Sequence, residues 1–450
     1  MSLQGDTDTI AAAATPPGQG GVGIVRMSGP RAFELASLVA GRLPPPRQAA
    51  LRALRDASGE ILDRGLVLSF PAPHSFTGED TVEFHLHGSP VLIGLLLRHL
   101  VSLGAREAGP GEFTRRAFIN GRMDLAQAEA VADLIESGSA EAARAAMRSL
   151  AGEFSTAVDE LGDALARLRV RLEAGLDFPD EGIDHVDDPG AAEEAVVMLL
   201  RLEALRAAAA RGRVLRDGLT LVIAGAPNAG KSSLLNRLAG YDAAIVTDEA
   251  GTTRDMVRED IVIDGMPVRV TDTAGLRVAA NRIEEEGIRR ARQAMAQADL
   301  VLLVRDGAAA PVSSQAAELP RGIPVLHVLN KIDLVDVPAG MTRGGDGRSE
   351  LRLSALTGAG VDLLRTHLKE RAGYTGEAGG AYAARRRHLD ALERAADHLG
   401  IAHGQLAAGA QVELAAEELR LAHQALGEIT GEFTTEDLLG SIFSEFCIGK

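Results

Sequence analysis

The sequence has a single cysteine, Cys447, among 450 residues. One cysteine excludes a disulfide bond within the chain and favours a reducing compartment. Long apolar runs are also missing, since no stretch approaches the roughly 18 uninterrupted apolar residues of a membrane helix. The first residues carry Asp6 and Asp8 and no basic group before a short apolar run, so we do not expect a secretory signal. These absences favour a cytoplasmic protein without a membrane segment.

Positive charge is in the minority, because 47 lysines and arginines face 63 aspartates and glutamates and give a formal net charge of −16. This balance argues against a protein that coats nucleic acid by bulk charge, although a local basic patch is compatible with it. Hydrophobic residues at 46% and charged residues at 24% are ordinary globular values. A chain of this length is expected to form roughly two to four domains.

Short strand-like runs separated by Gly and Pro turns fill the first 120 residues. The pattern predicts strands over residues 20–26, 66–70 and 81–87, and a helix over 91–103 that ends at Gly104. The mixture predicts an α+β domain.

Residues 125–213 have an Ala/Leu/Glu/Arg texture with apolar residues at helical spacing, interrupted by an acidic loop at 180–190. The same texture returns from residue 382 to the end. The segment between, 219–374, alternates short apolar strands with helices, which is typical of a doubly wound parallel sheet. Two similar helical stretches on either side of a different segment favour one helical domain with another domain inserted into it. The inserted strands are predicted at 219–224, 268–271, 300–304, 325–329 and 351–353.

A phosphate-binding motif lies directly after the first of these strands. Residues 225–232 read G-A-P-N-A-G-K-S and match G-x-x-x-x-G-K-[ST]. In this motif the loop N–H groups curl round phosphates, Lys231 neutralises the β/γ oxygens and Ser232 is a ligand of Mg²⁺. The alternative is a Gly-rich turn that binds nothing, and the strand–loop–helix context argues against it. The sequence therefore predicts a nucleotide site.

Further segments of the same domain suit a GTPase. Residues 272–275 (D-T-A-G) end a strand, where an aspartate holds Mg²⁺ through water, and 251–253 offer a threonine hydroxyl to the metal. In the segment 330–333 (N-K-I-D), the Asp333 carboxylate accepts both the N1–H and the exocyclic amine of guanine, and adenine has no matching donor pair. Residues 354–355 follow the last strand and support the base from its other side. The assembly resembles the Ras-like GTPase superfamily and predicts GTP as the ligand.

The glutamine that orients the attacking water in Ras-type enzymes is missing, because the residue after D-T-A-G is Leu276. The nearest carboxylates are Glu284 to Glu286. On spacing alone they also suit a solvated acidic first turn of a helix, which the helix dipole favours. Slow hydrolysis and the entry of another polar group both stay open on this ground.

Three blocks outside the nucleotide motifs carry a closer resemblance. They are residues 8–26, which include A-T-P-P-G-Q-G-G-V-G-I-V-R, residues 109–130, which begin G-P-G-E-F-T, and residues 429–450, which begin I-T-G-E-F-T-T-E-D-L-L and end F-C-I-G-K. A generic GTPase has none of these blocks. Along its whole length the chain resembles the tRNA modification GTPase MnmE family, also called TrmE.

This resemblance implies a multidomain α/β and α+β fold. The expected parts are an N-terminal tetrahydrofolate-binding and dimerisation domain (1–120), a helical domain in two pieces (121–216 and 376–450) and an inserted Ras-like P-loop GTPase domain (217–375). It also implies a homodimer, tRNA as a partner, and a heterotetramer with the flavoprotein MnmG (GidA), which carries FAD. The pair adds an aminomethyl or carboxymethylaminomethyl group to C5 of the wobble uridine, U34. 5-Formyl- or methylene-tetrahydrofolate supplies the one-carbon unit.

The resemblance assigns further residues to ligands. It implies folate contacts at Arg26, Glu83, Arg122 and Lys450. It implies K⁺ ligands at Asn228, Thr247, Glu249 and Thr252, and Mg²⁺ ligands at Ser232 and Thr253. Glu284 matches the family's water-orienting glutamate. With the motifs above, the expected GTP-binding residues are Asn228, Ala229, Gly230, Lys231, Ser232, Ser233, Thr247, Asp248, Glu249, Ala250, Gly251, Thr252, Thr253, Asp272, Thr273, Ala274, Gly275, Asn330, Lys331, Asp333, Ser354, Ala355 and Leu356.

Cys447 lies in the terminal block C-I-G-K, and the resemblance implies that it takes part in the modification. A thiolate there is a candidate nucleophile towards C6 of uridine, which would make C5 reactive. A free cysteine in a mobile tail is the alternative that composition alone favours.

Other interpretations of the same residues stay open. Glu83, His85 and His87 alternate along one predicted strand and form either a metal triad or, more commonly, a polar sheet face. The run 385–388 (R-R-R-H) is a candidate tRNA contact or a solvated helix surface. The alternative function is a GTP-dependent ribosome-assembly or RNA-binding switch without modification chemistry, which gives no reason for the C-terminal block. A stand-alone folate enzyme with a regulatory GTPase is a third.

Overall fold

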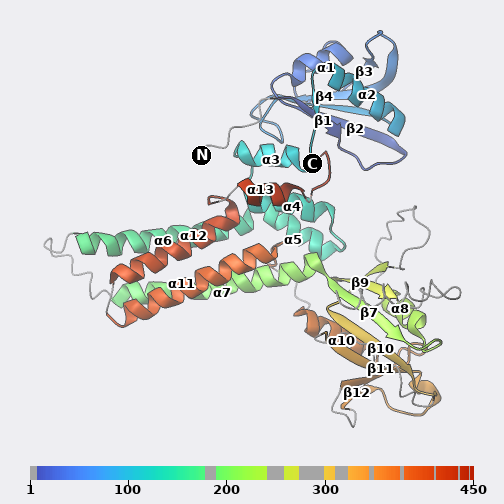
Figure 1. The fold of residues 1–450 in the computed structure, drawn as a ribbon, viewed down its shortest axis with the longest axis vertical. Helices are drawn as coiled ribbons and strands as arrows, with labels where there is room; N and C mark the ends of the chain where they lie inside the picture. The colour runs from blue at the N-terminus through green and yellow to red at the C-terminus, as the bar shows by residue number, and fades with distance from the viewer. Residues whose placement is uncertain are drawn as a thin grey trace. The chain divides into compact units, whose positions relative to one another are not determined.

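The computed structural model describes residues 8–177, 189–240, 258–272, 298–309, 323–343, 349–374, 380–409, 412–433, 436–444 and 446–449. The chain divides into two compact units, each described here by itself (Figure 1). Unit 1 contains residues 1–132, 155–171 and 419–450, and unit 2 contains residues 133–154 and 172–418. The predicted domain limits at 120, 216 and 375 stay predictions.

Unit 1 contains a six-stranded sheet with the strand order β3-β4-β5-β2-β1-β6. All neighbouring strands are antiparallel except β1 and β6. Helices α1 and α2 pack on the sheet through a core that includes Leu35, Leu100 and Phe84. The strands are β1 (Ile10–Ala13), β2 (Gly20–Ser28), β3 (Ala50–Arg55), β4 (Ile61–Phe70), β5 (Thr81–Gly88) and β6 (Arg106–Glu107), and the helices are α1 (Ala32–Ala40) and α2 (Pro90–Ser102). The predicted strands at 20–26, 66–70 and 81–87 and the predicted helix at 91–103 are confirmed.

Unit 1 also contains three short helices, of which the last belongs to the C-terminal segment of the chain. They are α3 (Glu112–Ile119), the start of α4 (Leu125–Ile135) and α13 (Glu436–Ser444). Leu125, Ile442 and Phe446 belong to the apolar cluster that holds α4 against α13 and the tail. This cluster brings residues 118–132 and 438–446, about 300 positions apart in the sequence, into one core.

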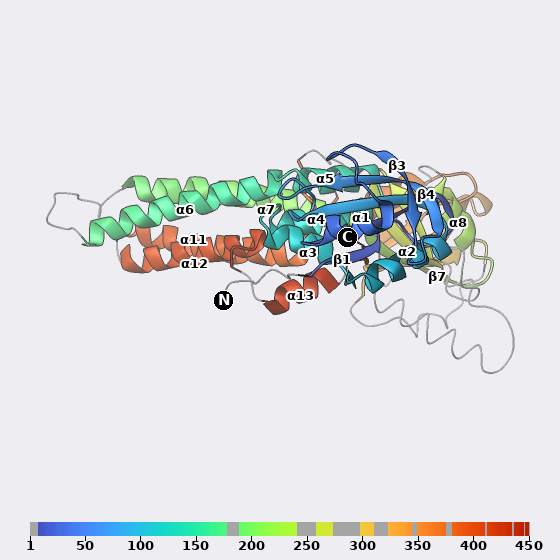
Figure 2. The same ribbon diagram turned by 90° about the horizontal axis from the view of Figure 1, so that it is seen from above.

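Unit 2 contains the long helices on either side of the inserted segment. Helix α7 (Pro189–Asp217) leads into that segment, and α11 (Arg386–Ala407) follows it. The two pack along each other, as Figures 1 and 2 show. Helix α5 (Ala140–Leu150) also belongs to this unit, whereas α6 (Glu153–Asp177) and α12 (Val412–Thr430) contribute to both units. Pairing of α7 with α11 explains how one helical domain accommodates an insertion between them.

The inserted segment is a seven-stranded sheet in the order β12-β13-β11-β10-β7-β9-β8. The five central strands are parallel, and the edge strands β8 and β12 are antiparallel to their neighbours. The strands are β7 (Leu219–Gly225), β8 (Arg258–Ile263), β9 (Met266–Asp272), β10 (Leu300–Asp306), β11 (Val325–Asn330), β12 (Gly340–Arg343) and β13 (Ser349–Arg352), with helices α8 (Lys231–Ala239), α10 (Val361–Ala372) and the 3₁₀ turn η4 (Ile332–Leu334). The five predicted strands and the doubly wound, mostly parallel fold class are confirmed. The two edge strands are additions to the prediction.

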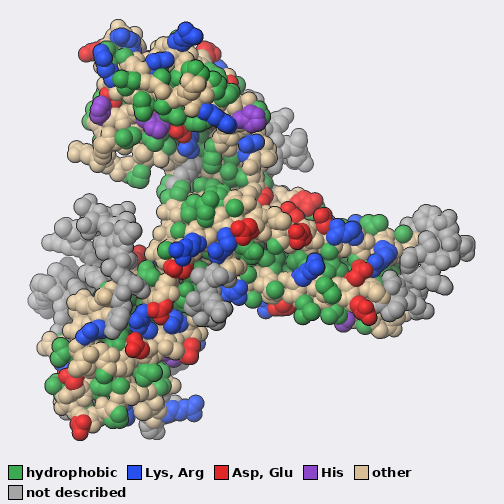
Figure 3. All heavy atoms as spheres, turned by 180° about the vertical axis from the view of Figure 1, so that it is seen from behind, with side chains coloured by type: hydrophobic (Ala, Val, Ile, Leu, Met, Phe, Trp, Pro, Cys, Tyr) green, Lys and Arg blue, Asp and Glu red, His purple; other side chains and the backbone are tan. Residues whose placement is uncertain are grey.

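The basic run 385–388 does not form a continuous positive surface. The Arg385 side chain is 11% exposed and pairs with Asp133 at 3.1 Å, and His388 is buried. Arg386 is exposed. On the face drawn in Figure 3, basic and acidic side chains are interspersed. Among the described residues, no helix combines the length and apolar character that crossing a bilayer requires.

Candidate functional site

The phosphate loop runs from the end of β7 to the start of α8, and its glycines are required by close backbone approaches. A Cβ on Gly225 would lie 2.1 Å from the Val304 carbonyl oxygen. Gly230 has φ +89°, and a Cβ there would lie 2.3 Å from the Asn330 side-chain nitrogen. Since a side chain at either position would collide, both glycines let the loop lie against β10 and β11.

Lys231 opens α8 with its side chain turned into the loop. It is 7% exposed, and its Nζ donates hydrogen bonds to the carbonyl oxygens of Gly225 at 3.0 Å and Ala226 at 2.9 Å. A buried ammonium beside the N-terminus of a helix creates a strongly positive position. This arrangement suits the phosphates of a nucleotide. Ser232 and Ser233 follow on the first turn of α8 and are exposed.

Asn330 joins three of the expected binding segments. It is 1% exposed, and its Nδ2 donates to the Ala229 carbonyl at 2.9 Å, while its Oδ1 accepts from the Ala355 N–H at 2.9 Å. The phosphate loop, the end of β11 and the loop after β13 therefore meet at one buried amide. The Ser354 hydroxyl accepts from the Thr357 N–H at 3.1 Å and shapes the last of these loops.

Lys331 has a left-handed backbone, φ +65°, and its Nζ lies 2.7 Å from an Asp306 carboxylate oxygen. The hydrogen bond from Lys331 lowers the pKa of Asp306, so this carboxylate stays ionised and holds the lysine. Asp333 lies in the η4 turn and is exposed. Asp306 is absent from the sequence prediction, although an acidic residue at the end of a buried parallel strand is a usable signal.

Several expected residues lie outside the described part of the chain. They are Thr247, Asp248, Glu249, Ala250, Gly251, Thr252, Thr253, Thr273, Ala274, Gly275, Glu284 and Lys450. Asp272 is described as the last residue of β9, where it is in register with Ile223 of β7. That position is two residues from Gly225, so the backbone places Asp272 next to the phosphate loop.

The expected folate residues Arg26 and Glu83 face each other across β2 and β5. The Arg26 Nε donates to a Glu83 carboxylate oxygen at 3.0 Å, and both side chains are about one-fifth exposed, at 23% and 17%. The guanidinium carbon of Arg26 lies 5.4 Å from the ring centre of Phe76 and 5.8 Å from that of Phe113. The pair forms a partly covered, charged site beside the half-buried ring of Phe76, and Phe113 is buried.

Glu83, His85 and His87 share one sheet face, because Val82, Phe84 and Leu86 on β5 are buried. His85 Nε2 lies 3.3 Å from Glu83, whereas His87 Nδ1 lies 2.8 Å from Asp63. In the described part of the chain, no group of three or more His, Cys, Asp and Glu side chains is arranged to hold a metal ion.

The C-terminal segment docks beside the Arg26 strand. Gly111 N–H donates to the Cys447 carbonyl at 3.3 Å, and Ile448 forms an isolated antiparallel bridge with Pro110. A Cβ on Gly449 would lie 2.0 Å from the Ala13 carbonyl oxygen, and Ala13 pairs with Val25 on β2. Cys447 is free and exposed. The tail is therefore held against β1 of the N-terminal sheet, at the residue whose β2 partner, Val25, precedes Arg26.

Arg122 is exposed. A Cβ on Gly78 would lie 3.1 Å from Cγ and 3.3 Å from Cδ of Arg122, so the Arg122 stem packs against Gly78. Asn120 donates to the Thr77 carbonyl at 2.7 Å, which holds the same loop. The loop between β4 and β5 thus carries Phe76 beside Arg26 and Gly78 beside Arg122.

Arg116 anchors this region, and sequence reasoning missed it. Its side chain is 2% exposed and forms ion pairs with Asp8 at 2.6 Å, Glu112 at 3.0 Å and Glu79 at 3.2 Å. Glu79 in turn accepts from the Ser28 hydroxyl at 2.8 Å. Glu112 lies four residues before Arg116 on α3, but Glu79 and Asp8 lie 37 and 108 residues away, so the local pattern does not predict the whole network.

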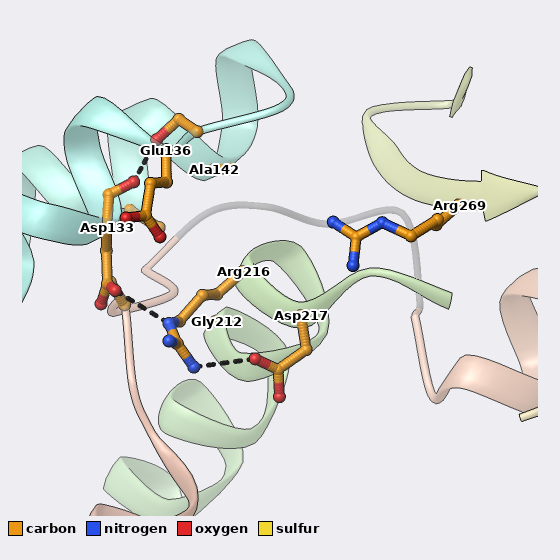
Figure 4. Close-up of a pocket in the computed structure, with 10 residues that line it drawn as sticks. Asp133, Glu136, Ala142, Gly212, Arg216, Asp217 and Arg269 are labelled. Carbon is orange, nitrogen blue, oxygen red and sulfur yellow. Dashed lines mark hydrogen bonds and ion pairs between the residues drawn. The ribbon is translucent and has the colours of Figure 1, made fainter. Parts of the chain in front are cut away.

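A separate polar cavity of about 260 Å³ lies in unit 2 where α7 meets β9 (Figure 4). Asp133 is 3% exposed in its side chain and accepts from Arg216 at 2.8 Å and Arg385 at 3.1 Å. Arg216 also donates to Asp217 at 2.8 Å. Arg216 precedes the inserted segment and Arg385 follows it. The buried Asp133 carboxylate therefore binds the two segments that connect the inserted sheet to the helices.

Comparison with known proteins gives matches to two family models. Residues 125–447 match the model described as "MnmE helical domain", and residues 9–122 match "GTP-binding protein TrmE N-terminus". The tRNA modification GTPase MnmE of Alkalilimnicola ehrlichii is 57% identical over 442 residues, covering 98% of this chain and 99% of that protein. The protein of the same name from Sodalis glossinidius is 54% identical over 452 residues, covering 99% of each chain.

Among solved structures, the G domain of the T. maritima FeoB iron transporter is 25% identical and covers 34% of this chain and 98% of its own, with a TM-score of 0.27. The family assignment depends instead on the full-length relatives and on the helical-domain model, which alone spans more than half of the sequence. The chain belongs to the MnmE (TrmE) family of tRNA modification GTPases.

Proposed function

We propose that this chain couples K⁺-activated GTP hydrolysis to modification of the wobble uridine, U34, in certain tRNAs. As a member of its family it is a tRNA modification GTPase. With the flavoprotein MnmG it adds an aminomethyl or carboxymethylaminomethyl group to C5 of U34, in the cytoplasm. The observation that supports this proposal most directly is the buried Asn330 amide, which joins the Lys231 phosphate loop to the two base-binding segments.

In the proposed nucleotide site, Lys231 and the N–H groups at the start of α8 bind the β- and γ-phosphates. Asp333 accepts the N1–H and amine of guanine. Ser232 at the exposed first turn of α8 and Thr253 are the proposed Mg²⁺ ligands, and oxygen donors of this kind suit that ion. Bound Mg²⁺ neutralises charge between the phosphates.

Asn228 is the described member of the proposed K⁺ site. Its φ of +60° belongs to the left-handed region, which asparagine tolerates better than most residues. Thr247, Glu249 and Thr252 would supply the remaining oxygens, and a cation held there would offset negative charge on the phosphates, as an arginine finger does. Glu284, which matches the family's water-orienting glutamate, orients the attacking water, since the Leu276 side chain has no hydrogen-bonding group.

Arg26, Glu83, Arg122 and Lys450 form the proposed tetrahydrofolate site. A pterin presents an amidine-like edge to the Glu83 carboxylate, and the glutamate tail presents carboxylates to basic groups. The half-buried ring of Phe76 lies beside Arg26 and suits contact with a flat ring, whereas Phe113 is buried below it in the core. 5-Formyl- or methylene-tetrahydrofolate bound there supplies the one-carbon unit.

Cys447 is proposed to act on the tRNA. Its thiolate adds to C6 of the uridine, which leaves the electron pair at C5 for bond formation, and loss of the C5 proton with release of the thiolate restores the ring. The docked tail supports this role, because the Cys447 carbonyl is held by Gly111 beside the proposed folate strand. Cys447→Ser is expected to keep GTP hydrolysis and abolish modification, and normal U34 modification in that variant would remove the thiol from the reaction.

We also propose a homodimer through the N-terminal domain and a heterotetramer with MnmG. Dimerisation of the GTPase domains across the nucleotide accompanies hydrolysis, and within a homodimer held by the N-terminal domains this pairing is intramolecular. These partners supply the FAD and the tRNA surface that the proposal requires.

The deciding experiment compares GTP turnover in KCl and NaCl at matched ionic strength. A large acceleration specific to K⁺ is expected from the Asn228 site. Equal rates would overturn the cation assignment. Binding of 5-formyltetrahydrofolate to the full chain, with Glu83→Gln as the matched variant, then separates the modification enzyme from a ribosome-assembly switch, which has no need of folate.

A further inference from the structure

The loop after β13, residues 354–358, begins with the buried Ser354 and Ala355 and has an exposed tip at Leu356. Ser354 N–H donates to the Ala359 carbonyl at 2.8 Å, and Gly358 N–H donates to the Ser354 carbonyl at 2.9 Å. These bonds close the loop on itself. Leu356 at its tip is 77% exposed, so apolar packing of that side chain does not fix the loop against the rest of the domain.

Two side chains from other elements hold the loop from outside. Asn330 accepts from the Ala355 N–H, as described above. Arg237, on the last turn of α8, donates from Nε to the Ala355 carbonyl at 3.0 Å and from Nη2 to the Leu356 carbonyl. A Cβ on Gly358 would lie 3.9 Å from the Arg237 guanidinium carbon, so the fork lies directly under the loop.

Arg237 therefore connects the loop to the helix that carries the phosphate-binding lysine. Lys231 and Arg237 lie six residues apart on α8, about 9 Å along the helix axis. Helix α8 is rigid, with the phosphate-binding Lys231 at one end and the Arg237 guanidinium near the other. It therefore fixes the distance between the phosphate loop and the loop 354–358. The planar fork reaches two successive carbonyl oxygens at once, which a lysine cannot reproduce.

We propose that Arg237 is a positioning residue for guanine nucleotides, a role that rests on the proposed GTP site. Its fork holds the Ala355 and Leu356 carbonyls so that the loop stands ready at the base before the nucleotide arrives. Because Asp333 reads the N1–H and amino side of guanine, the loop faces the remaining O6 edge. Arg237 thereby sharpens recognition of that edge, and the ligand class is a guanosine di- or triphosphate.

The test uses the full chain with Arg237→Met, which keeps the unbranched stem and removes both donors. The control is Arg371→Met, on the exposed last turn of α10 in the same sheet domain. Dissociation constants are measured for GDP, for inosine diphosphate, which lacks the amine, and for 6-thioguanosine diphosphate, which carries sulfur in place of O6. Loss of two charge-assisted hydrogen bonds and of preorganisation is expected to raise the Kd for GDP about tenfold.

The pattern across nucleotides distinguishes positioning from general damage. In Arg237→Met the ratio of the Kd for 6-thioguanosine diphosphate to the Kd for GDP is expected to fall. The ratio of the Kd for inosine diphosphate to that for GDP is expected to stay the same, because Asp333 is untouched. The loss appears in Kd and KM rather than in kcat, and Arg237→Lys recovers part of it. The control variant is expected to match the unmodified protein.

Three outcomes would overturn the inference. Equal GDP affinity in Arg237→Met and in the unmodified protein would overturn the positioning role of Arg237 and leave the GTP site standing. Equal losses for all three nucleotides together with a lower melting temperature would replace it with a purely structural role. Absence of GDP binding by the unmodified protein would overturn both the GTP site and the positioning role of Arg237.

Discussion

Replacing Arg116 by methionine tests whether the buried ion network holds unit 1 together. Arg116 is 2% exposed and pairs with Asp8, Glu79 and Glu112. Removing one partner of a buried pair typically costs about 3–5 kcal/mol. The lower end, about 3 kcal/mol, applies here because Arg106 still binds Asp8 and Glu112, both at 2.6 Å. Glu79 then keeps a hydroxyl partner but loses its buried cation.

The assay has to report on unit 1, and tyrosine fluorescence does not, because all three tyrosines, Tyr241, Tyr374 and Tyr382, belong to unit 2. Native-state hydrogen exchange of the α3 amides, residues 112–119, provides a local probe. A loss of about 3 kcal/mol speeds their exchange by roughly a hundredfold or more. Global melting is less informative, because a chain of two units need not unfold in one step.

Arg31→Met is the matched control. Arg31 pairs with Glu34 at 2.7 Å, but the two side chains are 48% and 58% exposed. Solvent screens an exposed pair of this kind, so its loss is expected to leave α3 exchange the same as in the unmodified protein. If Arg116→Met changed α3 exchange as little as Arg31→Met does, the argument that this network anchors α3 would be wrong.

Three further predictions concern the phosphate loop, the tail and acid stability. Lys231→Met removes the buried ammonium from the loop and is expected to reduce GTP turnover by at least a hundredfold in a phosphate-release assay, and near-normal turnover would contradict its role. Gly449→Ala places a Cβ 2.0 Å from the Ala13 carbonyl oxygen and is expected to displace the tail, so that U34 modification falls while GTP turnover stays; unchanged modification would contradict the docked arrangement. The hydrogen bond from Lys369 lowers the pKa of Asp264. The stability that this ion pair contributes is therefore present above the ordinary carboxyl pKa and is lost as the pH falls through the lower folded-state pKa. Asp264→Asn is therefore expected to reduce the acid destabilisation of unit 2, measured as hydrogen exchange of the α10 amides below the ordinary carboxyl pKa of about 4, and an unchanged pH dependence would remove Asp264 from acid unfolding.

Local patterns in the sequence determined most of the secondary structure and the nucleotide motif. Apolar runs and turn residues predicted the strands at 20–26 and 81–87, and the central strands of the inserted sheet, because burial and turn formation are decided over a few neighbouring residues. The G-A-P-N-A-G-K-S segment predicted a phosphate loop for the same reason. The edge strand β8 was also within reach, since Asp264-Gly265 between two β-rich runs is a hairpin signal.

The family resemblance was carried by sequence blocks at both ends of the chain, and the full-length relatives confirm it. It assigned Arg26 and Glu83 separately to folate contacts, and the register of β2 and β5 places these two residues opposite each other. The ligand roles given to these residues, and to Cys447, stay predictions. Glu284 and the loop 247–253 lie outside the described residues.

Only the tertiary structure decided which distant polar groups meet. Arg116 reaches Asp8, 108 residues away, and Asn330 reaches Ala229, 101 residues away. Arg237 reaches Leu356, 119 residues away. A single polar residue has no periodicity, and its partner is chosen by how the strands and helices pack, so nothing nearby in the sequence identifies it. The sequence by itself determined the elements and the chemistry they carry, whereas folding determined the contacts that hold that chemistry in place.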